Sequence, residues 1–162
     1  MNVVARCTLA HSLFGVGRMA EAEAETNKAL EVEECYFPAL RVLTFIKARQ
    51  EKWTEALQFA EKAAPSTPDS IGTLAGVLER MGEMRRAEEL IKELMLGDTY
   101  GAPNGLFNYY LLGGNMDRAV ECWEKVIEQR HPLAAIIASI YLRNTSRWPM
   151  LAKLMNLPEE TG

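Results

Sequence analysis

The stretch from Gly114 to Pro132, GNMDRAVECWEKVIEQRHP, decides the fold of this chain. It begins with turn-forming residues and continues as a helix, in which Ala119, Trp123 and Val126 fall at positions i, i+4 and i+7. Side chains at this spacing lie on one face of an α-helix. The stretch therefore predicts a turn followed by an amphipathic helix whose apolar face packs against a neighbour.

The same pattern occurs three more times earlier in the chain. The alanines that open it are Ala22, Ala56, Ala87 and Ala119, so the steps between them are 34, 31 and 32 residues. Each pattern follows a helical segment with an apolar pair: Leu9-Ala10, Leu43-Thr44, Leu74-Ala75 and Leu106-Phe107. A fixed period near 34 residues with two helices per repeat predicts an α-solenoid.

The turns inside the repeats support this interpretation. Three of the four contain a glycine, which adopts the left-handed backbone at a helix end without steric cost. We expect an all-α protein with a single domain over residues 1–162. Its repeats are predicted at about 3–35, 36–67, 68–98 and 102–131, followed by capping helices at about 132–157.

These positions resemble those of tetratricopeptide repeat (TPR) proteins. The matching residues are Leu9, Ala10, Gly17, Ala22, Ala29, Leu43, Trp53, Ala56, Ala63, Pro68, Leu74, Ala75, Gly82, Ala87, Leu106, Tyr110, Gly114, Ala119 and Trp123. No repeat carries the complete tryptophan–leucine–glycine–tyrosine signature, and Lys47 stands where a buried aromatic residue is usual. The resemblance implies a right-handed α-solenoid of TPR-like helix-turn-helix repeats that binds other proteins. The alternative is an irregular helical bundle.

The end of the chain resembles a narrower group, in which bacterial TPR arrays follow a protein kinase, an adenylate-cyclase-like domain or a winged-helix transcription regulator. The matching positions are Gly114, Asp117, Ala119, Trp123, Glu124, Arg130, Pro132, Arg147, Trp148, Leu151, Lys153, Leu154, Leu157 and Pro158. This resemblance implies a bacterial cytoplasmic protein and a sensor or regulatory module. It carries over no kinase or cyclase activity, because the chain contains no such domain.

Composition narrows the classes of partner. The net charge is −4 and the pI is about 5.3, so nothing favours nucleic acid as a ligand. No apolar run is long enough to cross a membrane. The three cysteines are an odd number at unrelated spacings, which favours reduced thiols in the cytoplasm.

The sequence offers one pair of residues with catalytic or metal-binding potential. Cys7 and His11 lie at i and i+4, on one helix face. A structural zinc site needs four ligands, and a cysteine nucleophile needs an orienting group and an oxyanion site. Neither requirement is met by the pattern, so we expect no metal, no cofactor and no enzymatic activity.

A partner site is expected on the concave side of the solenoid, which the first helix of each pair lines. The residues expected there mix cations, amides and one exposed phenylalanine; they are Thr8, His11, Arg41, Phe45, Arg49, Thr73, Arg80, Asn104, Asn108 and Leu111. Arginine binds carboxylates with two parallel hydrogen bonds, and asparagine pairs with peptide groups. We expect this groove to bind an extended or helical protein segment, unless these residues only pair with neighbouring helices.

Two other roles stay open at this point. The array starts directly in a repeat, and the outer face of a terminal repeat is normally capped. The first helices or the apolar tail could therefore join two copies into a homodimer. Alternatively, the chain is the C-terminal regulatory part of a larger bacterial kinase, cyclase or transcription regulator.

Overall fold

The structure is a computed structural model that describes residues 2–63, 67–96, 100–130 and 134–157. These residues form ten α-helices and no strand, which confirms the prediction of an all-α protein. The helices are α1 (Val3–Gly15), α2 (Met19–Val32), α3 (Phe37–Arg49), α4 (Trp53–Lys62), α5 (Pro68–Arg80), α6 (Met84–Leu96), α7 (Ala102–Gly113), α8 (Met116–Glu128), α9 (Ala134–Tyr141) and α10 (Trp148–Leu154). None of these helices has the length and apolar character needed to cross a membrane.

Short turns with left-handed residues separate the paired helices. Gly17, Gly82 and Gly114 have φ angles of 80°, 83° and 84°, as expected for glycines that end helices. The turn without a glycine uses Glu51 instead, with φ of 58°. This non-glycine residue stores local strain, which the packing of α3 against α4 holds in place.

Thr67 and Pro68 are residues typical of a helix start, and α5 begins at them. Thr67 Oγ1 accepts a hydrogen bond from the backbone N–H of Ser70 at 3.2 Å, and the Ser70 hydroxyl accepts one from the Thr67 N–H at 3.0 Å. Pro68 occupies the first helical position, where its missing N–H has no cost. This reciprocal cap fixes where α5 begins. Residues 64–66, 97–99 and 131–133, which lie in or next to predicted repeat boundaries, are outside the described residues.

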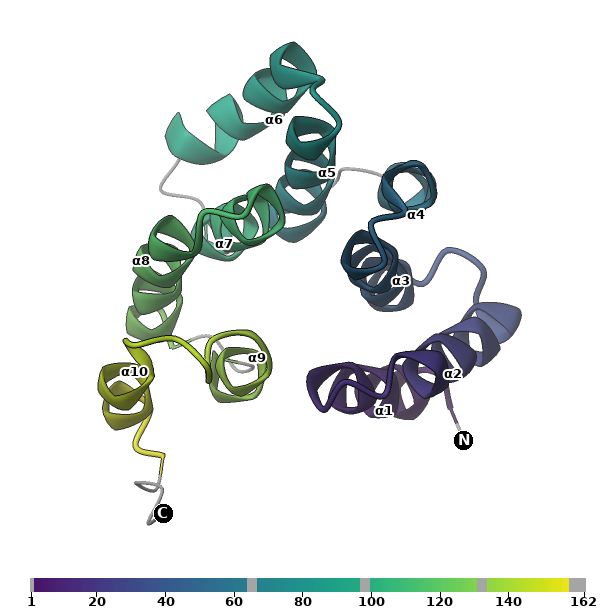
Figure 1. The fold of residues 1–162 in the computed structure, drawn as a ribbon, viewed down its shortest axis with the longest axis horizontal. Helices are drawn as coiled ribbons and strands as arrows, with labels where there is room; N and C mark the ends of the chain where they lie inside the picture. Colours follow the sequence, from purple (N-terminus) through teal and green to yellow (C-terminus); the bar gives the residue numbers. More distant parts are fainter. Residues whose placement is uncertain (1, 64–66, 97–99, 131–133, 158–162) are drawn as a thin grey trace.

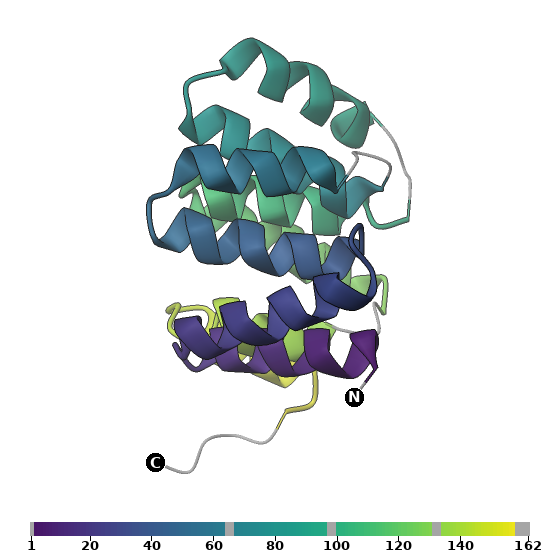
Figure 2. The ribbon, with the colours of Figure 1, turned by 90° about the vertical axis from the view of Figure 1, so that its right-hand side faces the viewer.

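The helices curve around a common centre (Figure 1). The odd-numbered helices face the inside and the even-numbered helices lie outside (Figure 1), and neighbours along the chain stack in rows (Figure 2). The curve is tight enough that α9 contacts α1. We call this closed arrangement the ring.

The core consists of two clusters that meet at α7. The first runs from α1 to α7 and includes Phe14, Phe45 and Leu78. The second runs from α7 to α10, where the Phe107 and Trp123 rings are 4.5 Å apart and both side chains are fully buried. The last helix covers this second cluster through Leu151, whereas Leu154 of the same helix is exposed.

The closest helix contact lies between α5 and α7. Glycines meet there: a Cβ added to Gly72 would lie 1.8 Å from the Gly105 carbonyl oxygen, and one added to Gly76 would lie 2.7 Å from the Leu112 Cβ. Because these positions have no side chain, the two backbones approach directly. This crossing makes α5 and α7 the rigid centre of the second half of the molecule.

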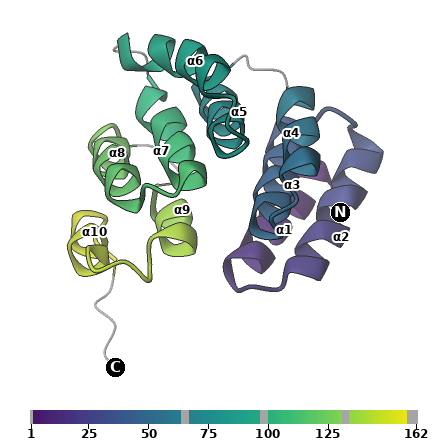
Figure 3. The ribbon, with the colours of Figure 1, turned by 45° about the horizontal axis from the view of Figure 1, so that its top comes forward.

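The ring divides into two halves, α1–α4 and α5–α10, which are clearly separated in Figure 3. They meet along a line of contacts that we call the seam, in which α4 and α3 touch α5, and α1 touches α9. Arg86 pairs with Glu61 across it at 3.0 Å, and Ile140 packs against Gly15. A Cβ at Gly15 would lie 2.8 Å from Ile140 Cγ1, so the glycine makes this close approach possible.

Lys47 shows how the chain departs from the TPR pattern. The side chain is 9% exposed, and its Nζ lies 2.7 Å from Glu23 Oε1 and 3.1 Å from Glu55 Oε2. Its pKa is raised, first by the hydrogen bond from the amine to Glu23. Two ion pairs of this buried lysine therefore connect α3 to α2 and to α4.

Candidate functional site

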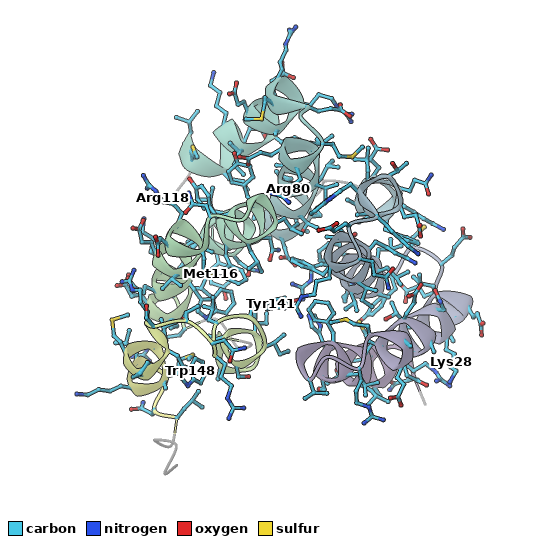
Figure 4. All side chains as sticks on the ribbon, viewed as in Figure 1. Lys28, Arg80, Met116, Arg118, Tyr141 and Trp148 are labelled. Carbon is cyan, nitrogen blue, oxygen red and sulfur yellow. The ribbon has the colours of Figure 1, made fainter. Side chains whose placement is uncertain are left out.

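The residues expected on the concave groove do lie on the inner helices, but many are buried. Arg41, Phe45, Thr73, Asn104 and Asn108 are all less than 9% exposed. The expectation that Phe45 is an exposed groove residue is wrong, because closure of the ring brings Tyr141 of α9 to 5.3 Å from the Phe45 ring. Figure 4 shows Tyr141 pointing into the middle of the ring.

The remaining groove residues are accessible to different degrees. His11 and Leu111 are partly buried, and Thr8, Arg49 and Arg80 are exposed. The Thr8 hydroxyl donates to the Val4 carbonyl oxygen of its own helix at 3.0 Å, so it is satisfied locally. The expected set thus separates into a buried group, which is mostly polar, and a second group of partly buried or exposed residues.

The buried group forms what we call the polar cluster, with Asp69 of α5 at its centre. Arg41 Nε lies 3.6 Å from Asp69 Oδ2, and Asn104 Nδ2 donates to Asp69 Oδ1 at 3.2 Å. Asn108 Nδ2 donates to the same carboxylate oxygen and to the Thr73 hydroxyl at 3.2 Å. The cluster connects α3, α5 and α7 across the seam.

His11 extends the polar cluster to α1. Arg41 Nη2 donates to His11 Nε2 at 3.1 Å, so the hydrogen-bond network assigns the ring proton to Nδ1. Burial, together with the Arg41 charge, lowers the pKa of His11 to about 3. The imidazole is therefore neutral near pH 7, and the nitrogen lone pair that a metal would need faces a guanidinium instead.

A buried ionic cluster of this kind adds little to the free energy of unfolding, but its directional contacts favour one relative position of the helices. Removing charges from water is expensive, and the Oδ1 atoms of Asn104 and Asn108 are buried without a hydrogen-bond partner in the described part of the chain. The directional contacts of Asp69 hold α3, α5 and α7 in one relative position, and the bond from Arg41 to His11 adds α1. We therefore assign the polar cluster a positioning role, setting how the two halves of the ring meet.

An open pocket of about 250 Å³ lies between the two halves of the ring, and we call it the seam pocket. Both halves line it, with the residues Phe14, Phe45, Ala48, Arg49, Trp53, Leu111, Leu112, Met116 and Tyr141. The Tyr141 ring lies 5.7 Å from Phe14, and Phe14 lies 6.5 Å from Phe45, all within the range of favourable aromatic pairs. The pocket is thus a concave site with preformed walls, and four of its nine lining residues are aromatic.

Two arginines lie on the aromatic wall. The Arg49 guanidinium carbon is 5.4 Å from the Phe14 ring centre, and that of Arg80 is 5.1 Å from the Trp53 ring centre. A cation within about 6 Å of an aromatic face is attracted by the ring. These contacts hold Arg49 in the lining of the seam pocket and hold Arg80 on Trp53, which is itself a lining residue.

A second, more polar hollow of about 400 Å³ continues from the seam pocket, and we call it the polar annexe. It shares Arg49, Met116 and Tyr141 with the seam pocket. Its other lining residues are Asp117, Val120, Ile140, Asn144, Thr145, Ser146 and Arg147. The two hollows therefore adjoin each other, one mainly apolar and the other more polar.

Sequence reasoning found part of this site and missed the rest. Phe45, Arg49 and Leu111 were expected at a partner surface, and all three line the seam pocket, Phe45 as a buried part of its wall. Phe14, Trp53 and Tyr141 were interpreted as packing residues or not singled out. Their signal was weak because an aromatic residue at the end of a helix looks the same whether its ring faces a core or a pocket.

No family model matches the chain, and no curated protein matches it. Within the described ranges, no three cysteine, histidine or acidic side chains lie together as metal ligands would. The geometry alone therefore indicates the chemistry: an aromatic depression with two fixed cations at its edge.

Proposed function

We propose that this chain is a TPR-like α-solenoid that binds a segment of another protein, acting as a regulatory or scaffolding module without catalysis of its own. The observation that carries the proposal is the seam pocket. Its volume of about 250 Å³ suits one large apolar side chain, and the adjoining polar annexe of about 400 Å³ leaves room for the residues next to it in a protein segment.

The residues that line the seam pocket favour a partner that inserts a large apolar side chain. Interface energy concentrates where aromatic or large apolar side chains enter well-packed pockets. Phe14, Phe45 and Tyr141 give such a pocket a rigid lining, because their rings already contact one another in the unbound chain. Binding then orders few side chains, which raises the affinity that a given contact area supplies.

The experiment is selection of binders from a library of random peptides displayed on phage, with the immobilised chain as target. The proposal predicts enrichment of peptides that share a bulky apolar residue. Their affinity is then measured by fluorescence anisotropy for the chain and for Met116→Gln, a charge-neutral change at the rim of the pocket. We expect about fivefold weaker binding, because the variant loses part of an apolar contact.

The matched control is Met84→Gln. Met84 opens α6 as Met116 opens α8, and the two side chains are 46% and 39% exposed. The control should bind as the unchanged chain does. If no peptide is enriched, or if both variants bind equally well, the seam pocket is not the partner site.

Self-association is a second candidate, favoured by one end of α6. Leu96 is 77% exposed, and Met95 and Tyr100 are 56% and 63% exposed. Light scattering over a range of concentrations tests this role. A constant monomer mass excludes it, and a mass that doubles and is reversed by Leu96→Glu supports it.

A further inference from the structure

The arginines beside the seam pocket differ from most cations of this chain. Arg6, Arg41 and Arg86, for example, each lie within 4 Å of a carboxylate oxygen of the same chain. Neither Arg49 nor Arg80 has such a carboxylate within 4.0 Å among the residues that the structure describes. Arg49 in the pocket lining, and Arg80 on the lining residue Trp53, are therefore available to pair with another molecule.

Their geometry prepares them for that molecule. Each guanidinium is held against an aromatic ring, which leaves its N–H groups free to donate to a carboxylate. An arginine that is already positioned loses little side-chain entropy on pairing. Arg49 is the better placed of the two, because it lines both the seam pocket and the polar annexe.

The local charge also favours an acidic partner. The chain as a whole has a net charge of −4, yet Arg49 and Arg80 give the edge of the pocket positive charge. In the polar annexe, Arg147 pairs with Glu124, and Asp117 adds one carboxylate to the lining. Charge complementarity of this kind selects partners and speeds their association.

From these observations we infer that the bound segment carries an aspartate or glutamate next to its bulky apolar residue, and that Arg49 pairs with that carboxylate. This inference rests on the proposed function of the seam pocket. The apolar side chain fills the seam pocket, and the acidic side chain meets Arg49 at the boundary with the polar annexe. Because the annexe continues beyond Arg49, the segment passes through the site and the acidic residue is internal to it.

The test is a double-mutant cycle with a peptide selected on the chain and blocked at both ends. The four affinities come from the peptide and its Glu→Gln or Asp→Gln form, each with the unchanged chain and with Arg49→Gln. Either single change should weaken binding about tenfold, and the double change should weaken it no further. Binding of the acidic peptide should also weaken as salt is raised.

The control variant is Arg85→Gln, an exposed arginine on α6 that pairs with Glu89 away from the pocket. It should leave the affinity unchanged, and far-ultraviolet circular dichroism checks that each variant keeps its helices. Additive losses in the cycle would overturn the role of Arg49. So would selected peptides without an acidic residue, or peptides that bind only through a free C-terminal carboxylate. In each of these cases weaker binding by Met116→Gln would still support the pocket, whereas a failed selection would overturn both proposals.

Discussion

The contact between α5 and α7 allows a sharp prediction for Gly72→Ala. The substitution adds one methyl group on a helix face that touches the other helix without any side chain between them. Its Cβ would lie 1.8 Å from the Gly105 carbonyl oxygen and 2.8 Å from the Gly105 Cα. Both neighbours are backbone atoms, so no side-chain rotation relieves the clash.

The size of the effect follows from these distances. Ordinary contacts of a Cβ begin near 3.4 Å, so the helices must move apart by roughly 1.5 Å at the crossing. Overpacking of a well-packed interior typically destabilises by about 1–3 kcal/mol, and the better helix propensity of alanine returns about 0.5–1 kcal/mol. We expect Gly72→Ala to lower the free energy of unfolding by about 2 kcal/mol, which lowers Tm by about 6 °C for a domain of this size.

Urea denaturation followed by circular dichroism at 222 nm measures this change. The control is Gly113→Ala at the end of α7, where the nearest atom to the new Cβ is Glu79 Oε2 at 3.2 Å. That carboxylate lies at the end of a flexible side chain, so the control should change the free energy of unfolding by less than about 1 kcal/mol. If Gly72→Ala is as stable as Gly113→Ala, the close glycine contact does not exist in solution.

Three further predictions concern buried groups. The pKa of His11 is lowered to about 3 in the folded chain, so between about pH 6.5 and pH 3 the unfolded chain binds a proton that the folded chain does not. The free energy of unfolding should therefore decrease as the pH is lowered through this range, by up to about 1.4 kcal/mol per pH unit. His11→Gln should flatten this part of the pH dependence, measured by urea denaturation. Lys47→Met should stay within about 1 kcal/mol of the unchanged chain in the same assay, because the methionine keeps the apolar stem and the two glutamates are partly solvated. Alkylation followed by mass spectrometry should label exposed Cys35 much faster than Cys7 or Cys122, whose pKa values burial raises to about 11.

The sequence predicted the helices well because their signals are local. Apolar spacing, the turn glycines and the Thr67-Pro68 start act within a few residues, and the observed helices follow them. The inner position of the groove residues also followed from the repeat. Glu51 was the exception, since its left-handed backbone replaces the glycine that the other turns contain.

The closure of the ring could not be predicted in the same way. It depends on the contact between Gly15 and Ile140, which are 125 positions apart, and on three aromatic side chains from three helices. No local pattern contains that information. For the same reason Asp69 was missed as the centre of the polar cluster, since in the sequence it is simply an acidic residue in the first turn of a helix.

The contact of α9 with α1 closes the ring and creates the seam pocket. The most direct test of this closure is whether a disulfide forms across the contact between α1 and α9. The Cβ of a residue at position 15 would lie 3.5 Å from the Ile140 Cβ, which fits the Cβ separation of about 3.5–4.5 Å in disulfides. The variant combines Gly15→Cys, Ile140→Cys and Cys35→Ser, and the comparison variant replaces Gly15→Cys by Thr8→Cys on the exposed side of α1.

After mild oxidation, mass spectrometry and thiol alkylation report the bond. We predict nearly complete disulfide formation for the pair at positions 15 and 140 and little for the pair at positions 8 and 140, with the bulky apolar peptide still binding to the locked chain. Free thiols at both positions 15 and 140 would contradict ring closure and the seam pocket that depends on it.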